Sequence, residues 1–220
     1  MVQRIETTAD GSHTIFSEDF GAQYHSSHGS VQESMTVFIE NGLFAIEKKK
    51  IDILEIGFGT GLNAALTFDQ TLTTERSISY LGIEKHPISI DLVDALNYSS
   101  FFTHDSTNDM LKSLHSTHHV MRSSEKHSFI GKLVIDDVFQ IAFDTSFDLI
   151  YFDAFAPSIQ EKLWKVPFLD KMFKALRPGG ILTTYCAQGQ FKRNLKEVGF
   201  MVESLPGPTG KREMTRARVL

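Results

Sequence analysis

The stretch Ile51-Asp-Ile-Leu-Glu-Ile-Gly57-Phe-Gly-Thr-Gly-Leu-Asn63 decides the fold that we predict for this chain. Its first half has the apolar content of a buried strand, and glycines follow at every second position. An apolar-periodic run from Leu62 to Phe68 then predicts the start of a helix. Glycine lets a ligand approach the backbone closely, and the free N–H groups at a helix start bind polar groups. The stretch therefore predicts a nucleotide-type ligand site.

The glycine spacing indicates which ligand the loop holds. A dinucleotide fingerprint would need its third glycine at position 62, which is Leu62. The pattern Glu55-x-Gly57-x-Gly59-x-Gly61 instead resembles motif I of the class I S-adenosylmethionine (SAM) methyltransferases. Glu84 follows about twenty residues after the loop, at the end of a second predicted strand, and its carboxylate suits a ribose diol. The alternative interpretation is a plain glycine-rich turn in an α/β core.

Bulk composition predicts a soluble enzyme of one α/β domain. The chain has 220 residues, of which 41% are hydrophobic and 22% charged. No apolar run has the length of a membrane span and the polar start lacks leader features, so we expect a cytoplasmic protein with no membrane partner. Cys186 is the single cysteine and the nine histidines are scattered, so no metal site is expected.

Basic residues concentrate at the carboxyl end of the chain. Residues 161–220 hold 12 Lys and Arg against 5 Asp and Glu, whereas residues 1–160 hold 10 against 22. A block of this sign is a candidate phosphate-binding face, although a solvated lysine-rich helix is the alternative.

The first 50 residues precede the predicted nucleotide-binding core. Ile5 to Phe16 reads as a small hairpin that turns at Asp10-Gly11, a favoured type I′ pair. Ser30 and Glu33 form the pattern of a capping box for a helix that reaches about Ile46.

Between these elements lies a polar and aromatic stretch, Phe20 to Gly29, without periodicity. Its residues Tyr24, His25 and Ser26 stand just ahead of the nucleotide strand, where they are well placed to cover a bound cofactor. A simple polar connector is the alternative.

Two later strands end in acidic residues. Lys132 to Ile135 predicts a third strand, followed by Asp136 and Asp137. The class I methyltransferases commonly place an acid here that accepts from an adenine amino group, and Asp137 fits this position better. Either residue could equally be a helix cap.

A near-continuous apolar run from Phe147 to Phe152 predicts a central strand, and Asp153-Ala-Phe155-Ala-Pro157 follows it. Because ligands meet the carboxyl ends of strands in an open parallel sheet, Asp153 should emerge beside the Gly57 loop. Its carboxylate can accept hydrogen bonds from a substrate amine and disperse the charge that develops there. Phe155 offers an aromatic face for a planar base. The alternative is that Asp153 only caps the strand end.

The last two strands, Met201 to Leu205 and Thr215 to Leu220, should be antiparallel. The Gly/Pro-rich loop between them carries Lys211 and Arg212, which could clamp a phosphate or form a basic hairpin tip.

Several of these stretches together resemble the bacterial MnmC/MnmD methyltransferases of tRNA wobble-uridine modification. The matching motifs are Tyr24-His-Ser with Glu33-Ser34 and Val37-Phe-Ile, Glu55 to Asn63, Asp153 to Pro157 with Leu163-Trp164, and Gly210-Lys-Arg-Glu-Met214. The resemblance runs from about residue 13 to residue 220. It implies methyl transfer from SAM to the primary amine of 5-aminomethyl-(2-thio)uridine in the anticodon stem-loop of tRNA, on an amine made by upstream modification enzymes.

The resemblance also implies a fold and a set of site residues. The fold is a Rossmann-like, seven-stranded, mostly parallel sheet with an antiparallel last strand, formed by residues 51–220 behind an N-terminal extension of residues 1–50. The expected catalytic residues are Asp153 and Phe155; the cofactor residues are Tyr24, Ser26, Glu55, Gly57, Gly59, Gly61, Asn63, Glu84 and Asp137; the tRNA residues are Pro157, Lys211 and Arg212.

Two-domain relatives add a flavin-dependent oxidase, but no second glycine-rich nucleotide motif follows here, so methyl transfer without flavin is expected. A small-amine N-methyltransferase, an aminopropyltransferase and a non-catalytic SAM-binding module are the alternatives.

Overall fold

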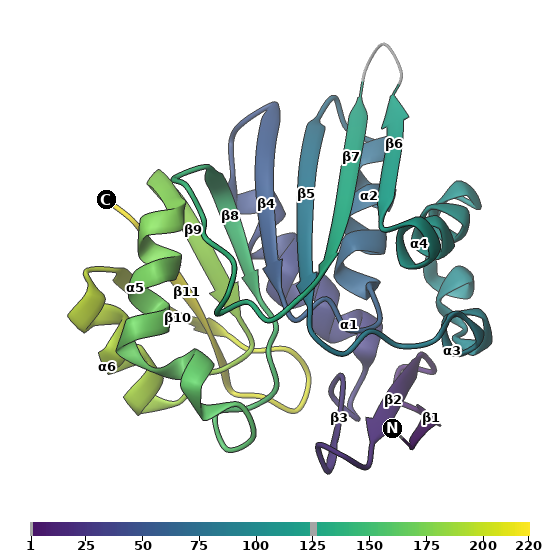
Figure 1. Cartoon of the computed structure of the whole chain (residues 1–220), viewed down its shortest axis with the longest axis horizontal. Helices are drawn as coiled ribbons and strands as arrows, with labels where there is room; N and C mark the ends of the chain where they lie inside the picture. The colour runs from purple at the N-terminus through teal and green to yellow at the C-terminus, as the bar shows by residue number, and fades with distance from the viewer. Residues whose placement is uncertain (1, 124–126) are drawn as a thin grey trace.

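An eight-stranded sheet separates two layers of helices in the computed structural model of the chain, which describes residues 2–123 and 127–220 (Figure 1). The strand order is β10-β11-β9-β8-β4-β5-β7-β6. The strands are β4 (Lys50–Ile56), β5 (Ser77–Glu84), β6 (His119–Ser123), β7 (Ser128–Ile135), β8 (Phe147–Phe152), β9 (Leu176–Thr184), β10 (Met201–Pro206) and β11 (Glu213–Arg218). Strands β7, β5, β4, β8 and β9 are mutually parallel and β11 is antiparallel to β9. The predicted α/β fold is confirmed, with β6 as an additional antiparallel strand at one edge.

The two faces of the sheet carry different helices, as Figure 1 shows. The helices are α2 (Leu62–Leu72), α3 (Ile90–Ala95), α4 (Ser106–Thr117), α5 (Val166–Ala175) and α6 (Gly189–Val198), with short 3-10 turns at Tyr98–Phe101 and Glu161–Trp164. Alternation along β4 sends Ile53 into the core beside α2 and α4, and Leu54 into the core beside α5 and α6. Both faces of the sheet are therefore buried at its centre, as an all-parallel core requires.

Strand β4 lies at the switch point of the sheet. It pairs in parallel with β5 on one side and with β8 on the other, and Ile56 is opposite Phe152 in the β8 pairing. The loops after β4 and β8 therefore leave the sheet side by side, which is where ligands bind in open α/β sheets.

The N-terminal hairpin forms, but its predicted two-residue turn is wrong. Strands β1 (Gln3–Thr7), β2 (His13–Ser17) and β3 (Ala22–Gln23) make a separate small sheet. A five-residue loop joins β1 to β2, because Thr7 pairs with His13. Asp10 is not in the left-handed region that a type I′ turn needs, and its carboxylate instead accepts from the N–H of Ser12 at 2.9 Å and from that of Gln32 at 3.0 Å.

The predicted capping box is also wrong. Helix α1 (Ser30–Ser34) begins after Gly29 with no side-chain cap from Ser30, and it continues as a π-helix (Met35–Glu40) and a 3-10 turn (Leu43–Ala45). The hairpin loop satisfies the free donors instead, because Ser12 Oγ accepts from Ser30 N at 3.1 Å and Asp10 caps Gln32. Glu33 is thereby released for a contact with Ser26 N at 2.9 Å.

Candidate active site

The predicted glycine loop lies against the end of β8. Gly57 has φ +86°, and a Cβ atom there would stand 2.5 Å from the carbonyl oxygen of Asp153. The Asp153 N–H in turn donates to Ile56 O at 2.9 Å. This approach leaves no room for a side chain at position 57, so glycine is required.

Glu84 lies at the end of β5 and binds the same loop. One carboxylate oxygen accepts from Gly59 N at 2.9 Å and the other accepts from His86 N at 2.8 Å. Each oxygen keeps a lone pair for one further donor. The geometry fits a ribose diol, whose two hydroxyls would donate to a carboxylate that is already fixed in place.

A cavity of about 650 Å³ opens over these strand ends. Nine of the predicted site residues line it: Tyr24, Ser26, Gly57, Gly59, Glu84, Asp137, Asp153, Phe155 and Lys211. Five do not line it: Glu55, Gly61, Asn63, Pro157 and Arg212. Pockets of about 300–1,000 Å³ typically bind small molecules. The volume of this cavity therefore suits a nucleoside-type ligand together with part of a second reactant.

Asp153 is half-buried in the cavity wall. Its carboxylate accepts from Asn63 Nδ2 at 2.8 Å. Burial is the largest influence and, together with the nearby Glu33 carboxylate, raises the pKa of Asp153 to about 7, against the opposing effects of Asn63 and Lys211. Near neutral pH, Asp153 can therefore both accept and release a proton.

Glu55 and Asn63 lie behind the cavity and hold Asp153. Glu55 is fully buried, and its two oxygens accept from Asn63 Nδ2 and from Tyr80 Oη at 2.8 and 2.7 Å. Burial and the Asp153 charge raise the pKa of Glu55 well above its usual range. The Asn63 amide bridges both carboxyl groups, whereas its own Oδ1 has no partner among the described residues. Asn63 therefore fixes the direction of Asp153.

Aromatic rings form one side of the cavity. Phe155 is held by its backbone, which accepts from Trp164 Nε1 at 2.9 Å and donates to Gln160 Oε1 at 2.8 Å. The Phe20 ring stacks on Phe155 with centroids 4.6 Å apart, and Tyr24 meets the same ring edge-on at 5.1 Å. Sequence reasoning missed Phe20, although an aromatic residue within a polar loop was a usable signal.

The predicted cofactor cover does lie over the glycine loop. A Cβ atom on Gly59 would stand 2.9 Å from the Tyr24 ring, and burial raises the pKa of Tyr24 to about 12. His25 is held by Thr14, whose hydroxyl accepts from His25 N at 3.1 Å, and burial lowers the pKa of His25 to about 4. Both side chains are therefore uncharged at neutral pH, and they present a polar but neutral surface to a ligand.

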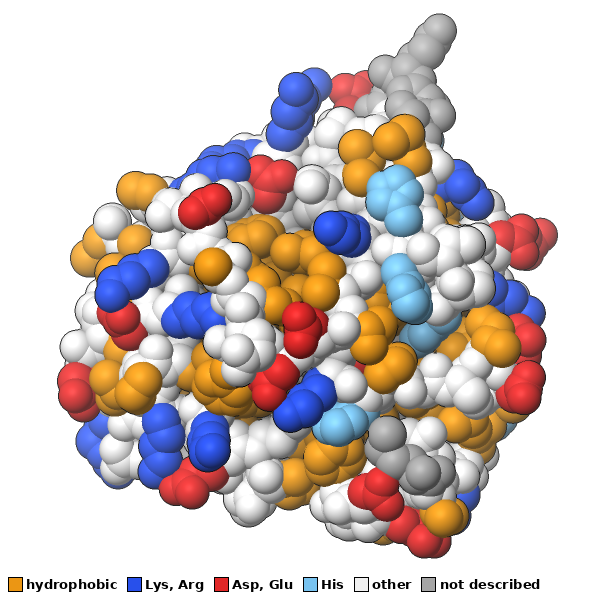
Figure 2. Space-filling model, in the orientation of Figure 1, with side chains coloured by type: hydrophobic (Ala, Val, Ile, Leu, Met, Phe, Trp, Pro, Cys, Tyr) orange, Lys and Arg blue, Asp and Glu red, His pale blue; other side chains and the backbone are white. Residues whose placement is uncertain are grey.

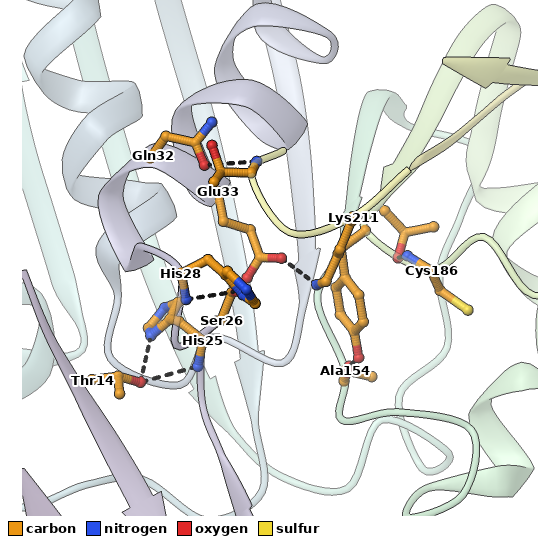
Figure 3. A network of polar contacts seen from close by, with 12 residues as sticks. Thr14, His25, Ser26, His28, Gln32, Glu33, Ala154, Cys186 and Lys211 are labelled. Atoms are coloured by element: carbon orange, nitrogen blue, oxygen red, sulfur yellow. Dashed lines mark hydrogen bonds and ion pairs between the residues drawn. The ribbon is translucent and has the colours of Figure 1, made fainter. Parts of the chain in front are cut away.

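Figure 3 shows how the cover is held from the opposite end of the chain. Glu33 of α1 accepts from Ser26 N with one oxygen and forms an ion pair with Lys211 through the other. Lys211 comes from the loop between β10 and β11, and its ammonium lies 4.0 Å over the Tyr185 ring. The Lys211 charge is thus engaged inside the protein, whereas its neighbour Arg212 is exposed and makes no ion pair within the described part of the chain.

Asp137 lies at the rim of the cavity in a tight turn. Its carboxylate accepts from Phe139 N at 3.0 Å and forms an ion pair with Lys85 at 2.9 Å. The Lys85 hydrogen bond is the main cause of a lowered pKa at Asp137. The residue before it, Asp136, accepts from Asp137 N at 2.7 Å. Both acids therefore shape the turn, and the lowered pKa keeps Asp137 ionised and able to accept hydrogen bonds at the cavity rim.

Acidic partners neutralise much of the basic carboxyl-terminal block. Pairs form between Lys165 and Glu161, Lys174 and Asp170, Arg177 and Asp148, Lys192 and Glu213, Lys211 and Glu33, and Arg216 and Glu203. Blue and red side chains are interspersed over the face drawn in Figure 2. Sequence charge alone therefore overstated the free positive charge of this region.

Residues 2–123 and 127–220 contain no group of three or more His, Cys, Asp or Glu side chains arranged to hold a metal ion. Within the same ranges, no helix has both the length and the apolar content needed to cross a bilayer.

Comparison with known proteins assigns the fold and the class of chemistry. The family described as S-adenosyl-L-methionine-dependent methyltransferase matches residues 101–219. The tRNA 5-methylaminomethyl-2-thiouridine biosynthesis bifunctional protein MnmC of Pseudoalteromonas atlantica is 31% identical over 96% of the chain, and that of a Marinomonas species is 28% identical over 90%. These matches cover 32% and 31% of the two relatives, so the chain spans about a third of their length.

Solved structures share the fold at lower identity. MNMC2 from Aquifex aeolicus superimposes with a TM-score of 0.79 and 24% identity, covering 100% of this chain and 70% of that one. Spermidine synthase from Thermotoga maritima gives a TM-score of 0.57 with 14% identity, covering 99% of this chain and 79% of that one.

Proposed function

We propose that the chain, which belongs to the S-adenosyl-L-methionine-dependent methyltransferases, methylates the primary amine of 5-aminomethyl-(2-thio)uridine at the wobble position of tRNA. The product is 5-methylaminomethyl-(2-thio)uridine. One observation carries this proposal: Asp153 and Phe155 face the glycine loop within a single cavity. The MnmC relatives, named for this modification and matching at least nine-tenths of the chain, support the choice of substrate.

The cofactor of the family is SAM, and the residues present fit it. When bound, SAM supplies an electrophilic methyl group on a positively charged sulfur. The loop from Gly57 to Gly61 would hold the amino-acid part, Glu84 the ribose hydroxyls and Asp137 the adenine amino group. Tyr24 and Ser26 would cover the cofactor.

Asp153 would supply the proton transfer that methylation of an amine needs. A primary alkyl amine is mostly protonated in neutral water, and an ammonium has no lone pair to attack with. Inside the cavity, desolvation favours the neutral amine and raises the pKa of Asp153 to about 7, which brings the two proton affinities together. Asp153 would accept the proton that the amine nitrogen loses when it gains the methyl group.

The aromatic wall would position the base. Phe155 is held rigidly by Trp164 and Gln160, so its ring is a fixed platform. Phe20 stacks on one face of that ring, with centroids 4.6 Å apart, and extends the aromatic wall. An extruded uridine could stack there with its aminomethyl group directed toward Asp153.

Outside the cavity, we propose that the exposed Arg212 contacts the phosphate backbone of the anticodon stem-loop. Residues 1–50 would form an N-terminal extension that contains the cofactor cover, and residues 51–220 would form the methyltransferase domain proper. The protein would work in the cytoplasm, after upstream enzymes have made the aminomethyl group.

Mass spectrometry of tRNA nucleosides tests the proposal. Hypomodified tRNA that carries 5-aminomethyl-2-thiouridine is incubated with the purified protein and SAM. We expect 5-methylaminomethyl-2-thiouridine to appear, with no methylation of free nucleosides or polyamines under the same conditions. Methylated polyamine with unchanged tRNA would reject the substrate assignment and leave the family assignment standing.

A further inference from the structure

The buried ion pair between Glu33 and Lys211 joins segments 178 residues apart in the sequence. The Glu33 side chain is only 7% exposed and that of Lys211 is 31% exposed. Two charges in such a position are costly to desolvate, so they must compensate each other. Both side chains also line the cavity that holds Asp153.

Each partner is tied to a different part of the site. Glu33 accepts from Ser26 N at 2.9 Å and so fixes the backbone of the cofactor cover, residues 24–29. Lys211 lies over the Tyr185 ring, and the Tyr185 hydroxyl donates to Ala154 O at 2.9 Å, one residue beyond Asp153. The pair therefore connects the cover to the loop that carries the catalytic acid, as Figure 3 shows.

The loop that carries Lys211 has one further contact with α1 and one with the cover. Thr209 N donates to Gln32 Oε1 at 3.2 Å. Gly210 has φ +83°, and a Cβ atom there would stand 2.5 Å from the His28 ring. Lys211 is thus held in its inward position by packing as well as by charge.

We propose that Glu33 and Lys211 form a latch that positions the cofactor cover and sets the charge beside Asp153. Lys211 then acts through Glu33 and Asp153 as a positioning residue and makes no phosphate contact. Arg212, the next residue, is the one that faces solvent. The effect of the latch on SAM affinity rests only on the SAM dependence of the family. Its effect on the pH dependence of methylation rests also on the proposed reaction.

The partners have opposite electrostatic effects on Asp153. The Glu33 charge raises the pKa of Asp153, and the Lys211 charge lowers it. The titratable or charged groups that interact with Asp153 are Glu33 from α1, Glu55 from β4, Tyr80 from β5, Tyr98 from the turn after α3, Tyr185 after β9, and Lys211. Of these, only Glu33 and Lys211 form an ion pair with each other.

SAM affinity measured by calorimetry tests the latch without tRNA. The variants are Glu33→Gln, Lys211→Met, the double variant, and Arg212→Met as the matched control. Lys211→Met leaves a buried carboxylate without its counter-ion, so we expect SAM Kd to rise about 10-fold or more. The double variant should bind at least five-fold better than the product of the single losses predicts, because it buries no lone charge. Arg212→Met should change Kd by less than about two-fold.

Two further readouts separate a latch from a merely structural contact. First, the acidic limb of the pH profile of kcat/KM should move to higher pH in Lys211→Met and to lower pH in Glu33→Gln. Second, the slope of log K against log salt concentration for tRNA binding should fall by about one in Arg212→Met and stay unchanged in Lys211→Met. Glu33→Gln keeps the side-chain size and the acceptor for Ser26, so it remains informative if Lys211→Met does not fold. Wild-type SAM affinity in both single variants, additive losses in the double variant, or a reduced salt slope in Lys211→Met would overturn the latch. A failed tRNA reaction with the expected Kd pattern would reject the proposed substrate and leave the latch intact.

Discussion

The floor and the cover of the cavity are built in different ways. The floor consists of the ends of β4, β5 and β8, where parallel pairing sets Ile56 against Phe152 and places Gly57 against Asp153. The cover consists of residues 24–29 and is held by polar contacts from Thr14 and from Glu33, which in turn pairs with Lys211. The floor is a continuation of the sheet ladder, whereas the cover is held by side-chain contacts and, through Glu33, by a lysine 178 residues further along the chain.

This difference matches what each part must do. The proposed catalytic role of Asp153 needs a fixed direction, which the strand ends and the Asn63 amide give to its carboxylate. A cofactor must enter and leave, so its cover must open at a small cost, and isolated polar contacts open more easily than a buried sheet. Substitutions in the floor should therefore damage chemistry or folding, and substitutions in the cover should mainly change binding.

The largest effect should come from Asp153→Ala. Loss of the proton acceptor should lower kcat for tRNA methylation by about 100-fold to 10,000-fold, with SAM affinity nearly unchanged. Wild-type kcat/KM should fall as the pH drops through about 7, because the protonated carboxyl cannot accept a proton, and the variant should lack this limb. Methylation rates between pH 5.5 and 9 measure both effects. Wild-type turnover in the variant would remove Asp153 from the mechanism.

Asp153→Asn tests the same residue through stability. The folded-state pKa of about 7 lies above the ordinary value of 3.8, so the native state holds this proton more tightly than the unfolded chain does. The stabilising contribution of the acid is complete below about pH 4 and is lost as the pH rises through about 7. At pH 8 without ligand, Asp153→Asn should therefore raise the Tm, and the gain should vanish at acidic pH. An equal shift at both pH values would contradict the raised pKa.

The next effect should come from Gly57→Ala, which attacks the floor itself. The new Cβ atom would lie 2.5 Å from Asp153 O, in a backbone with positive φ. We therefore expect the free energy of unfolding to fall by about 3 kcal/mol and SAM binding to weaken. Gly179→Ala is the matched control, because Gly179 has φ +78° with no atom within 4 Å of its Cβ position. The control should cost only about 1 kcal/mol, measured by urea unfolding. Equal losses would show that backbone strain alone, and not the close approach, makes Gly57 necessary.

Phe20→Ala should have a smaller effect, confined to substrate binding. Removal of the ring stacked on Phe155 should raise KM for tRNA about 10-fold and leave SAM Kd unchanged, because base stacking contributes about 1–3 kcal/mol. Phe44→Ala is the control, since Phe44 is exposed and lies outside the cavity lining. Equal KM values for the two variants would exclude Phe20 from the base site.

Asp10→Ala should give the smallest change. It removes the cap on Gln32 N at the start of α1, which typically costs about 1 kcal/mol and should lower Tm by a few degrees. Hydrogen bonds from Ser12, Gln32 and Thr8 outweigh burial and lower the pKa of Asp10, so the penalty should shrink as the pH falls below about 4. Asp19→Ala, on an exposed turn, serves as the control. A Tm unchanged by Asp10→Ala would show that the hairpin loop does not cap α1.

The floor was predictable from the sequence, and the cover only in part. Strand β8 matches its predicted range, and β4 and α2 begin within one residue of theirs, because each has a strong apolar pattern followed by glycine or acid. The turn at Asp10 and the cap at Ser30 were wrong, because residues 8–12 form a longer loop, in which Asp10 accepts from Ser12 N, and because Asp10 and Ser12 also accept from backbone N–H groups at the start of α1. Sequence patterns within a few residues do not indicate hydrogen bonds between the hairpin loop and a later helix.

The sequence by itself determined the fold, the glycine loop and the acids at the strand ends, because each depends on residues within a few positions of one another. Only the tertiary structure decided which side chains reach the cavity. It turns Lys211 inward to Glu33 and leaves its neighbour Arg212 in solvent, and it stacks Phe20 on Phe155 from the other end of the chain. The physical reason is that burial and charge compensation depend on neighbours in space, and here those neighbours are more than a hundred residues apart.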